Sequence, residues 1–323
     1  MRIIDEETII IPNRRSEIDK VPKVYEKIDD GLYKLKLHAT FYIVRTWQGL
    51  GDNIYQLPFV RQLKNRFGEN LVLKTPWPEL FEGIKVTRPL DKLQAQSENV
   101  QKNVKSYLEL QNRVNLKLGY ITEDLKKMSI ISGIEKNTFQ LEAFNMSLLI
   151  KEEWKEEAEK LNLPDNTILL YPPTIRSDWY CPERNPDPIY FQKIIDAFPE
   201  FYYVSLGYIR SNLEKYEKEL TGIHRYLDKG ELHYTTIFAL LNRFPAVLRP
   251  SFMLPASISV GGRSLCLYGG HFSPEILTDP RMDLKRHWYV APEPFTNWYI
   301  TDINKKLEID VVLNSFRSMV YGP

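Results

Sequence analysis

Residues 40–74 contain a strand, a glycine-rich turn, an amphipathic helix and a second strand in direct succession. The apolar stretch Thr40–Arg45 is followed by the sequence GLGDN and then by apolar residues at helical spacing, which are Ile54, Leu57, Val60, Leu63 and Phe67. Gly68 fits the C-cap of this helix, and the second strand covers Leu71–Lys74. This succession predicts an α/β protein whose parallel sheet binds ligands at the carboxyl ends of its strands.

The second half of the chain repeats this alternation of strands and helices. We expect strands within 167–171, 201–207, 246–250 and 263–270, and helices within 189–198, 235–244 and 252–260. A chain of 323 residues that is 43% hydrophobic is long enough for two domains. We therefore expect a lead-in segment at 1–38, a first domain at 39–160, a second domain at 161–303, and a terminal helix at 304–323 that docks back onto one of them.

Composition excludes several classes of protein. With 43 Lys and Arg against 42 Asp and Glu, the net charge of +1 provides no global attraction to nucleic acids or membranes. Cys181 and Cys266 lack metal-ligand spacing, so we expect neither a disulfide nor a metal site. The sequence has no P-loop, HExxH or GxSxG motif, which removes P-loop ATPases, zinc proteases and serine hydrolases.

The amino-terminal residues argue against export. The sequence MRIIDEETIIIPNRR has acidic residues where a signal peptide has a basic end. No apolar run approaches the ~20 residues that are needed to span a bilayer. We therefore expect a cytoplasmic protein.

The turn GLGDN raises the first chemical question. A Gly-X-Gly turn before a helix brings backbone N–H groups close to a ligand, but Asp52 directly after it would repel a phosphate. In one interpretation, Gly49 and Gly51 permit a tight turn, and Asp52 hydrogen-bonds or deprotonates a hydroxyl-bearing substrate with Asn53 on the same side. In the other, Asp52 is simply the N-cap of the helix. The local sequence leaves both interpretations open.

Polar residues and glycines follow the strands that we expect in the second half. Thr174, Arg176 and Ser177 come after the strand at 167–171, and hydroxyls beside a guanidinium suit a phosphate or diphosphate. In the alternative, Arg176 pairs on the surface with Asp178 or Asp187. The other strand ends contribute four further candidates, which are Gly207, Ser251, Gly269 and Gly270. Glycines at these positions let a ligand approach the backbone, and a serine can start a helix whose N–H groups face the same edge.

Three stretches resemble glycosyltransferase family 9, the ADP-heptose:lipopolysaccharide heptosyltransferases, which have the GT-B fold. They are RTWQGLGDNIYQLPFVRQLKNRFG at 45–68, ILLYPPTIRSDWYCPERNPDPIYFQKII at 168–195 and TTIFALLNRFPAVLRPSFMLPASISVGGRSLCLYGG at 235–270. The individual motifs are short. Their order and spacing along the chain carry the resemblance.

The resemblance implies two Rossmann-like domains with parallel sheets that face a central cleft. The first domain would bind a hydroxyl acceptor, such as a saccharide, and the second a nucleotide-sugar. Asp52 would be the general base of an inverting sugar transfer, Thr174 and Arg176 would lie near the donor diphosphate, and Ser251 would contact the donor phosphate. The resemblance also implies no metal and no cofactor besides the nucleotide-sugar, because protein groups in this fold stabilise the departing diphosphate.

The sequence departs from the family pattern in the donor loops. Trp179 stands where the family has a basic residue, and Pro250, Ser251 and Phe252 replace an Asp-Thr-Gly that precedes a histidine. The donor therefore need not be ADP-heptose, and a catalytically altered binding or scaffold protein is an alternative.

A second alternative is a sugar transferase that acts on modified nucleic-acid bases. Its signature would be the clustering on one face of five lysines, which are Lys102, Lys105, Lys117, Lys126 and Lys127. A dehydrogenase is disfavoured, because neither half has GxGxxG with a downstream acid at the required spacing.

Overall fold

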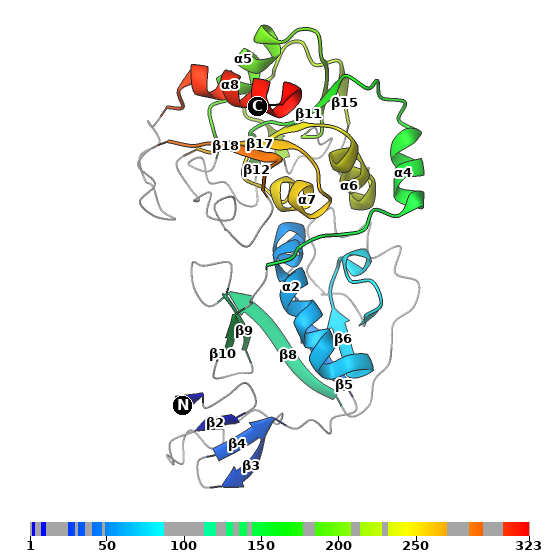
Figure 1. Ribbon diagram of the computed structural model, residues 1–323, viewed down its shortest axis with the longest axis vertical. Coiled ribbons are helices and arrows are strands. Elements are labelled where there is room, and N and C mark those ends of the chain that lie inside the picture. Colours follow the sequence, from blue (N-terminus) through cyan, green and yellow to red (C-terminus); the bar gives the residue numbers. More distant parts are fainter. Residues whose placement is uncertain are drawn as a thin grey trace. The chain divides into compact units, whose positions relative to one another are not determined.

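The computed structural model describes residues 2–3, 8–10, 25–29, 32–35, 41–46, 49–86, 113–120, 127–131, 136–140, 144–176, 185–207, 214–227, 232–269, 284–292 and 306–322 (Figure 1). The chain divides into two compact units, Met1–Asn145 and Met146–Pro323. This division lies before the boundary that we expect after residue 160. The reason is that α4 (Glu152–Glu159) packs on α6 (Tyr234–Arg243), where the rings of Trp154 and Phe238 meet edge to face at 6.4 Å between centroids.

The lead-in segment contains a small antiparallel sheet of its own. Its strands are β1 (Arg2–Ile3), β2 (Thr8–Ile10), β3 (Tyr25–Asp29) and β4 (Leu32–Leu35), in the order β1-β2-β4-β3. The alternation of apolar and charged residues from residue 32 onward is typical of such a strand with one exposed face.

The main sheet of the first unit is mixed. Its strands are β5 (Phe41–Arg45), β6 (Leu71–Lys74), β7 (Lys85–Val86), β8 (Arg113–Tyr120), β9 (Lys127–Ile131) and β10 (Lys136–Gln140), in the order β10-β9-β8-β5-β6-β7. β5 is parallel to β6 and β8, which confirms the strand–helix–strand unit. β8, β9 and β10 pair antiparallel, as strands joined by short connections do. The polar composition around 91–127 does not reveal β8, and β9 and β10 follow this stretch.

Helix α2 (Leu50–Phe67) connects β5 to β6. Its five periodic apolar residues, from Ile54 to Phe67, are all buried, which confirms the helix and the face that it buries. Gly68 ends the helix with a φ of 54°, and the short 3-10 helix η1 (Gly68–Asn70) leads into β6. Pro58 lies inside α2, where it has no N–H to donate to the carbonyl of Ile54.

The second unit is built on a sheet in which every neighbouring pair is parallel. Its strands are β11 (Thr167–Tyr171), β13 (Tyr202–Ser205), β15 (Arg225–Tyr226), β16 (Ala246–Leu248), β17 (Ser264–Leu267) and β18 (His287–Val290), in the order β15-β13-β11-β16-β17-β18. Their carboxyl ends therefore lie along one edge. A small antiparallel pair, β12 (Thr174–Arg176) and β14 (Glu214–Tyr216), follows β11 and β13 at this edge.

The helices of the second unit cover this sheet. Besides α4 and α6 they are α5 (Ile189–Ala197), α7 (Met253–Ser259) and α8 (Ile309–Tyr321). The terminal helix α8 lies beside α5 (Figure 1), where the rings of Phe316 and Phe198 are 4.7 Å apart between centroids. Tyr321 at its end donates a hydrogen bond to the Glu200 carboxylate at 2.5 Å. The terminal helix therefore docks within the second unit.

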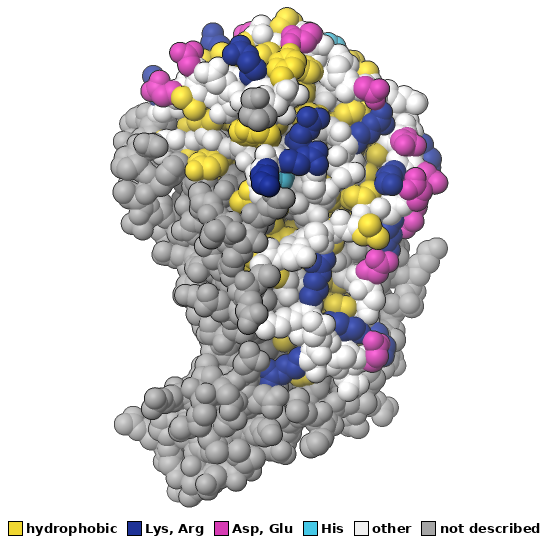
Figure 2. All heavy atoms as spheres, in the orientation of Figure 1, with side chains coloured by type: hydrophobic (Ala, Val, Ile, Leu, Met, Phe, Trp, Pro, Cys, Tyr) yellow, Lys and Arg dark blue, Asp and Glu magenta, His cyan; other side chains and the backbone are white. Residues whose placement is uncertain are grey.

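Charges of both signs are interleaved on the exposed side of α4 (Figure 2). Lys155 pairs with Glu152 at 2.9 Å, and Lys160 pairs with Glu157. The lysines at 102, 105 and 126, which would mark a nucleic-acid site, lie outside the described residues. Among the helices that the structure describes, none is both long and apolar enough to cross a membrane.

Candidate active site

The start of α2 differs from both local interpretations of GLGDN. Gly49, not Asp52, is the N-cap residue, with φ −67° and ψ 139° and no side-chain cap. The interpretation of Asp52 as N-cap is therefore wrong. Asp52 lies in the first turn, where a carboxylate interacts favourably with the helix dipole. Gly51 lies in the same turn, inside the helix.

Gly49 provides space for a neighbouring side chain and is not required by its backbone conformation. Its φ is open to any residue, so the tight-turn explanation of this glycine does not hold. A Cβ on Gly49 would stand 2.5 Å from Oδ2 of Asp52 and 3.4 Å from its Cγ. The half-buried Asp52 side chain therefore folds back over Gly49, and the missing Cβ leaves room for its carboxylate.

Asn53 lies in a buried polar network and not on an exposed acceptor surface. Its side chain is 0% exposed. Its Nδ2 donates to the Gly49 carbonyl at 2.8 Å, and its Oδ1 accepts from the Thr75 hydroxyl at 2.9 Å. Thr75 also accepts a bond from the Trp77 amide at 3.1 Å. The loop after β6 thereby holds the first turn of α2.

In the second unit, the carboxyl edge of the sheet contains a buried arginine that the sequence analysis missed. Arg249 follows β16 and is 6% exposed. Its Nη2 donates to the Thr174 hydroxyl at 2.5 Å, and its Nε donates to the Pro172 carbonyl at 3.3 Å. Its guanidinium lies 4.8 Å from the centroid of the Tyr171 ring. In the sequence, the signal for Arg249 was its charge directly after the apolar residues 246–248 of an expected strand.

Thr174, which we expected at a donor diphosphate, is the partner of this arginine. Its side chain is 3% exposed, and its carbonyl accepts from Nδ2 of Asn185 at 3.1 Å. The structure thus joins the loop after β11 to the loop after β16. These are the ends of two neighbouring parallel strands, where an open α/β sheet binds its ligands.

Ser251 and Gly207 also serve the local structure. The Ser251 hydroxyl accepts from the Met253 amide at 3.2 Å and so starts α7, while the Phe252 ring meets Tyr171 edge-on. At the end of β13, a Cβ on Gly207 would stand 3.2 Å from both the Pro172 ring and the Tyr216 ring. Gly207 therefore allows β14 to pack closely against the loop after β11.

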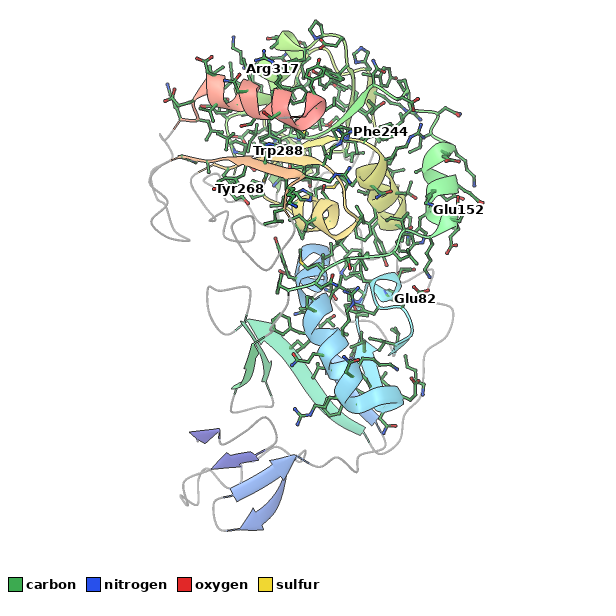
Figure 3. The ribbon with its side chains drawn as sticks, in the orientation of Figure 1. Glu82, Glu152, Phe244, Tyr268, Trp288 and Arg317 are labelled. Atoms are coloured by element: carbon green, nitrogen blue, oxygen red, sulfur yellow. The ribbon has the colours of Figure 1, made fainter. Side chains whose placement is uncertain are left out.

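Several expected site residues lie outside the description. Arg176 is described by its backbone alone, in register with Glu214, and Ser177, Asp178, Trp179 and Gly270 lie outside the described residues. Asp187 accepts from the Ile189 amide at 2.9 Å at the start of α5. Gly269 is half-buried and directly follows Tyr268. The Tyr268 amide donates to the Val290 carbonyl at 2.9 Å, and Trp288 lies in the same strand as Val290 (Figure 3).

Metal-binding side chains do not gather in the parts of the chain that the structure covers. There, no group of three or more His, Cys, Asp or Glu residues is arranged to hold a metal ion. Cys266 is buried, and Cys181 lies outside the described residues.

Comparisons with known proteins give different results for the sequence and for the fold. No protein-family model matches the sequence, and no curated protein sequence is significantly similar to it. The fold, in contrast, matches solved structures. An ADP-heptose lps heptosyltransferase II of E. coli superposes with a TM-score of 0.55 at 12% identity, over 87% of this chain and 98% of its own. A glycosyl transferase of family 9 from Veillonella parvula superposes with a TM-score of 0.54 at 14% identity, over 90% of this chain and 99% of its own.

These matches extend over nearly the full length of both proteins. They agree with the parallel sheets and the order of strands and helices described above, and with the resemblance of the three sequence stretches. At this level of identity they establish the fold. The chain therefore has the α/β fold of the family 9, heptosyltransferase-like glycosyltransferases.

Proposed function

We propose that the chain is a glycosyltransferase that moves a sugar from a nucleotide-sugar to a hydroxyl acceptor. Two proteins that share its fold over nearly their whole length are named as glycosyltransferases. The observation that carries the proposal is the position of the half-buried Asp52 carboxylate. It packs against Gly49 in the first turn of α2, the helix that follows β5. This is the position that the family resemblance assigns to the base.

In the proposed reaction, Asp52 removes the proton of the acceptor hydroxyl as its oxygen attacks the anomeric carbon. A new bond forms between this oxygen and the anomeric carbon. The bond from that carbon to the diphosphate oxygen breaks, and its electron pair leaves with the nucleoside diphosphate. The proton stays on Asp52 until it passes to solvent. Attack opposite to the leaving group inverts the anomeric configuration.

We place the donor at the carboxyl edge of the second unit. Arg249 and Thr174 join two strand ends there, and the half-buried Ser251 lies two residues after the arginine. A guanidinium near this edge favours negative charge through its electric field. The proposal needs no metal, because protein donors stabilise the departing diphosphate. A cytoplasmic location, where thiols stay reduced, suits the two cysteines.

The first test identifies the donor. Thermal stability of the purified chain is measured with ADP-heptose and with ADP-, UDP-, GDP- and CDP-glucose, one at a time. A donor at 100 times its Kd stabilises the folded state by about 2.7 kcal/mol, so selective binding is readily measured. Release of nucleoside diphosphate from the stabilising donor, with and without saccharide acceptors, then measures turnover.

The second test concerns the base. Asp52→Asn keeps the size of the side chain but removes its basicity, so we expect turnover to fall by about 10²- to 10⁴-fold with donor binding unchanged. Asp165→Asn is the control, because this exposed carboxylate pairs with Arg243 in the second unit. Unchanged turnover in Asp52→Asn would refute the role of Asp52. If no donor stabilises the wild type, the chain is better described as a binding or scaffold protein with this fold.

A further inference from the structure

We propose that the buried pair of Asn53 and Thr75 is a positioning device for Asp52, an inference that rests on the proposed function. Neither residue would touch the substrate. Together with Gly49, they would fix the place of the carboxylate relative to the sheet.

The contacts begin at the carboxylate. The Asp52 side chain lies over Gly49, with Oδ2 at 2.5 Å from the place of a Cβ on that glycine. The carboxylate therefore occupies the space that a side chain at Gly49 would fill. The backbone angles of Gly49 suit any residue, so the missing side chain serves the carboxylate and not the turn.

The carbonyl of Gly49 is held by two donors from one residue. The backbone amide of Asn53 donates to it at 3.1 Å, and the side-chain Nδ2 of Asn53 donates to it at 2.8 Å. The first bond is the ordinary first bond of the helix. The second adds a constraint that an apolar side chain at this position would not supply.

The side chain of Asn53 is in turn held by the sheet. Its Oδ1 accepts from the Thr75 hydroxyl at 2.9 Å, and Thr75 accepts from the Trp77 amide at 3.1 Å. Asn53 and Thr75 are both 0% exposed. Thr46, at the end of β5, donates its amide to the Lys74 carbonyl at 3.2 Å, so the ends of β5 and β6 are joined beside the same network.

We assign this network a function because Asn53 and Thr75 are polar residues at buried positions where apolar side chains would also fit. Buried amides and hydroxyls must keep their hydrogen bonds, and an apolar pair would secure the helix without this requirement. Hydrogen bonds are directional, however, and so they fix a position more sharply than apolar contact does. A general base benefits from this, because a displacement of ~1 Å can cost about a hundredfold in rate.

The test compares two buried threonines. Thr75→Val removes the hydroxyl that holds Asn53 and preserves the branched shape. Thr167→Val is the matched control, because Thr167 is 1% exposed and its hydroxyl donates to the Pro164 carbonyl at 2.6 Å, at the start of β11 and away from the carboxyl edge. Thr75→Ser restores the hydroxyl.

The readout is the release of nucleoside diphosphate, with water as acceptor, from whichever donor of the panel stabilises the wild type. We expect both valine variants to lower the Tm by a few degrees, about 2–4 °C. Only Thr75→Val should lower kcat, by about tenfold to a hundredfold, with the KM for the donor within about twofold. Thr75→Ser should regain most of the lost kcat.

Gly49→Ala tests the same idea without removing a hydrogen-bonding group from the buried network. Alanine tolerates the backbone angles, but its methyl group displaces the Asp52 carboxylate, so kcat should fall with little change in Tm. If Thr75→Val and Gly49→Ala both lower kcat no more than Thr167→Val does, the network has a structural role alone and the inference fails. A wild type that releases no nucleoside diphosphate from any donor, with saccharide acceptors as well as with water, refutes the proposed function, and this inference with it.

Discussion

The two candidate regions each hold a charged side chain in the segment that follows a parallel strand, but they hold it differently. In the first unit, the Asp52 carboxylate is half-buried and rests on a glycine that neutral groups keep in place. In the second unit, the Arg249 guanidinium is itself buried and bonded to a hydroxyl and a carbonyl. Other residues thus position the Asp52 carboxylate, whereas the Arg249 guanidinium itself holds two loops of the second unit together.

This difference separates activity from stability. Replacement of Asp52 should affect turnover, because the network beneath the carboxylate is made by other residues. Replacement of Arg249 should affect folding first, because two loops of the second unit depend on its hydrogen bonds. The following predictions test this contrast.

The largest effect is expected for Arg249→Met. The change leaves the Thr174 hydroxyl and the Pro172 carbonyl without a charged donor, and such bonds contribute about 1.5–3 kcal/mol each. We expect a loss of about 3 kcal/mol in the free energy of unfolding, measured by urea denaturation.

The matched control for this variant is Arg243→Met. Arg243 also lies over an aromatic ring, that of Phe244 at 4.7 Å, but it pairs with an exposed carboxylate of Asp165. Surface pairs of this kind contribute at most about 1 kcal/mol. Equal losses in the two variants would show that Arg249 is not a structural tie.

A smaller effect is expected for Gly207→Ala. The new methyl group would meet the rings of Pro172 and Tyr216 at 3.2 Å, and crowding in a packed region costs about 1–3 kcal/mol. We expect a loss near 1 kcal/mol, visible as a lower urea midpoint. Gly49→Ala should leave the midpoint nearly unchanged, because its methyl group meets the end of a side chain that can move. The reverse order of midpoints would contradict the contrast between the two units.

The smallest effect concerns the pH dependence of the second unit. The hydroxyl of Tyr321 donates to Glu200 and lowers the pKa of that carboxyl. The contribution to stability is therefore present above the ordinary carboxyl pKa and is lost as the pH falls through the lowered value. The same bond raises the pKa of Tyr321, so its contribution is present below the ordinary tyrosine pKa and is lost as the pH rises through the raised value.

Tyr321→Phe should remove the pH dependence of stability that this hydrogen bond causes, in the acidic range and in the alkaline range. Urea midpoints of the variant and the wild type should differ slightly near neutral pH and converge at acidic and alkaline pH. A constant difference at every pH would assign the effect to packing of the ring against Phe201, at 6.0 Å between centroids, and not to the hydrogen bond.

The residues that the sequence revealed are those whose partners are close in the chain. Strand, turn and helix at 40–74 form one contiguous unit, so periodicity located α2 and its buried face, and the glycine-rich turn drew attention to Asp52. Arg249 escaped because its partners, Pro172 and Thr174, are 77 and 75 residues away and meet it only when β11 and β16 pair.

The roles of the remaining candidates depended on tertiary contacts in the same way. Thr174 and Asn53 are polar residues beside expected ligand edges, and the sequence could not show that both are buried by protein partners. The strands β8, β9 and β10 lie at the end of a polar stretch or after it, and that stretch favoured a solvated helix or a loop although the residues of β8 themselves alternate between polar and apolar. Composition describes solvent exposure, whereas pairing depends on residues elsewhere in the sheet.

Pro58 interrupts the series of backbone hydrogen bonds within α2. Helices resist local unfolding because consecutive backbone bonds form cooperatively, and Pro58 removes the bond to the carbonyl of Ile54. The turns that contain Asp52 and Asn53 are therefore less tightly coupled to the rest of the helix. In hydrogen-exchange experiments, the amides before Pro58 and those after it should therefore differ in protection, although buried residues such as Ile54 and Val60 lie on both sides of it.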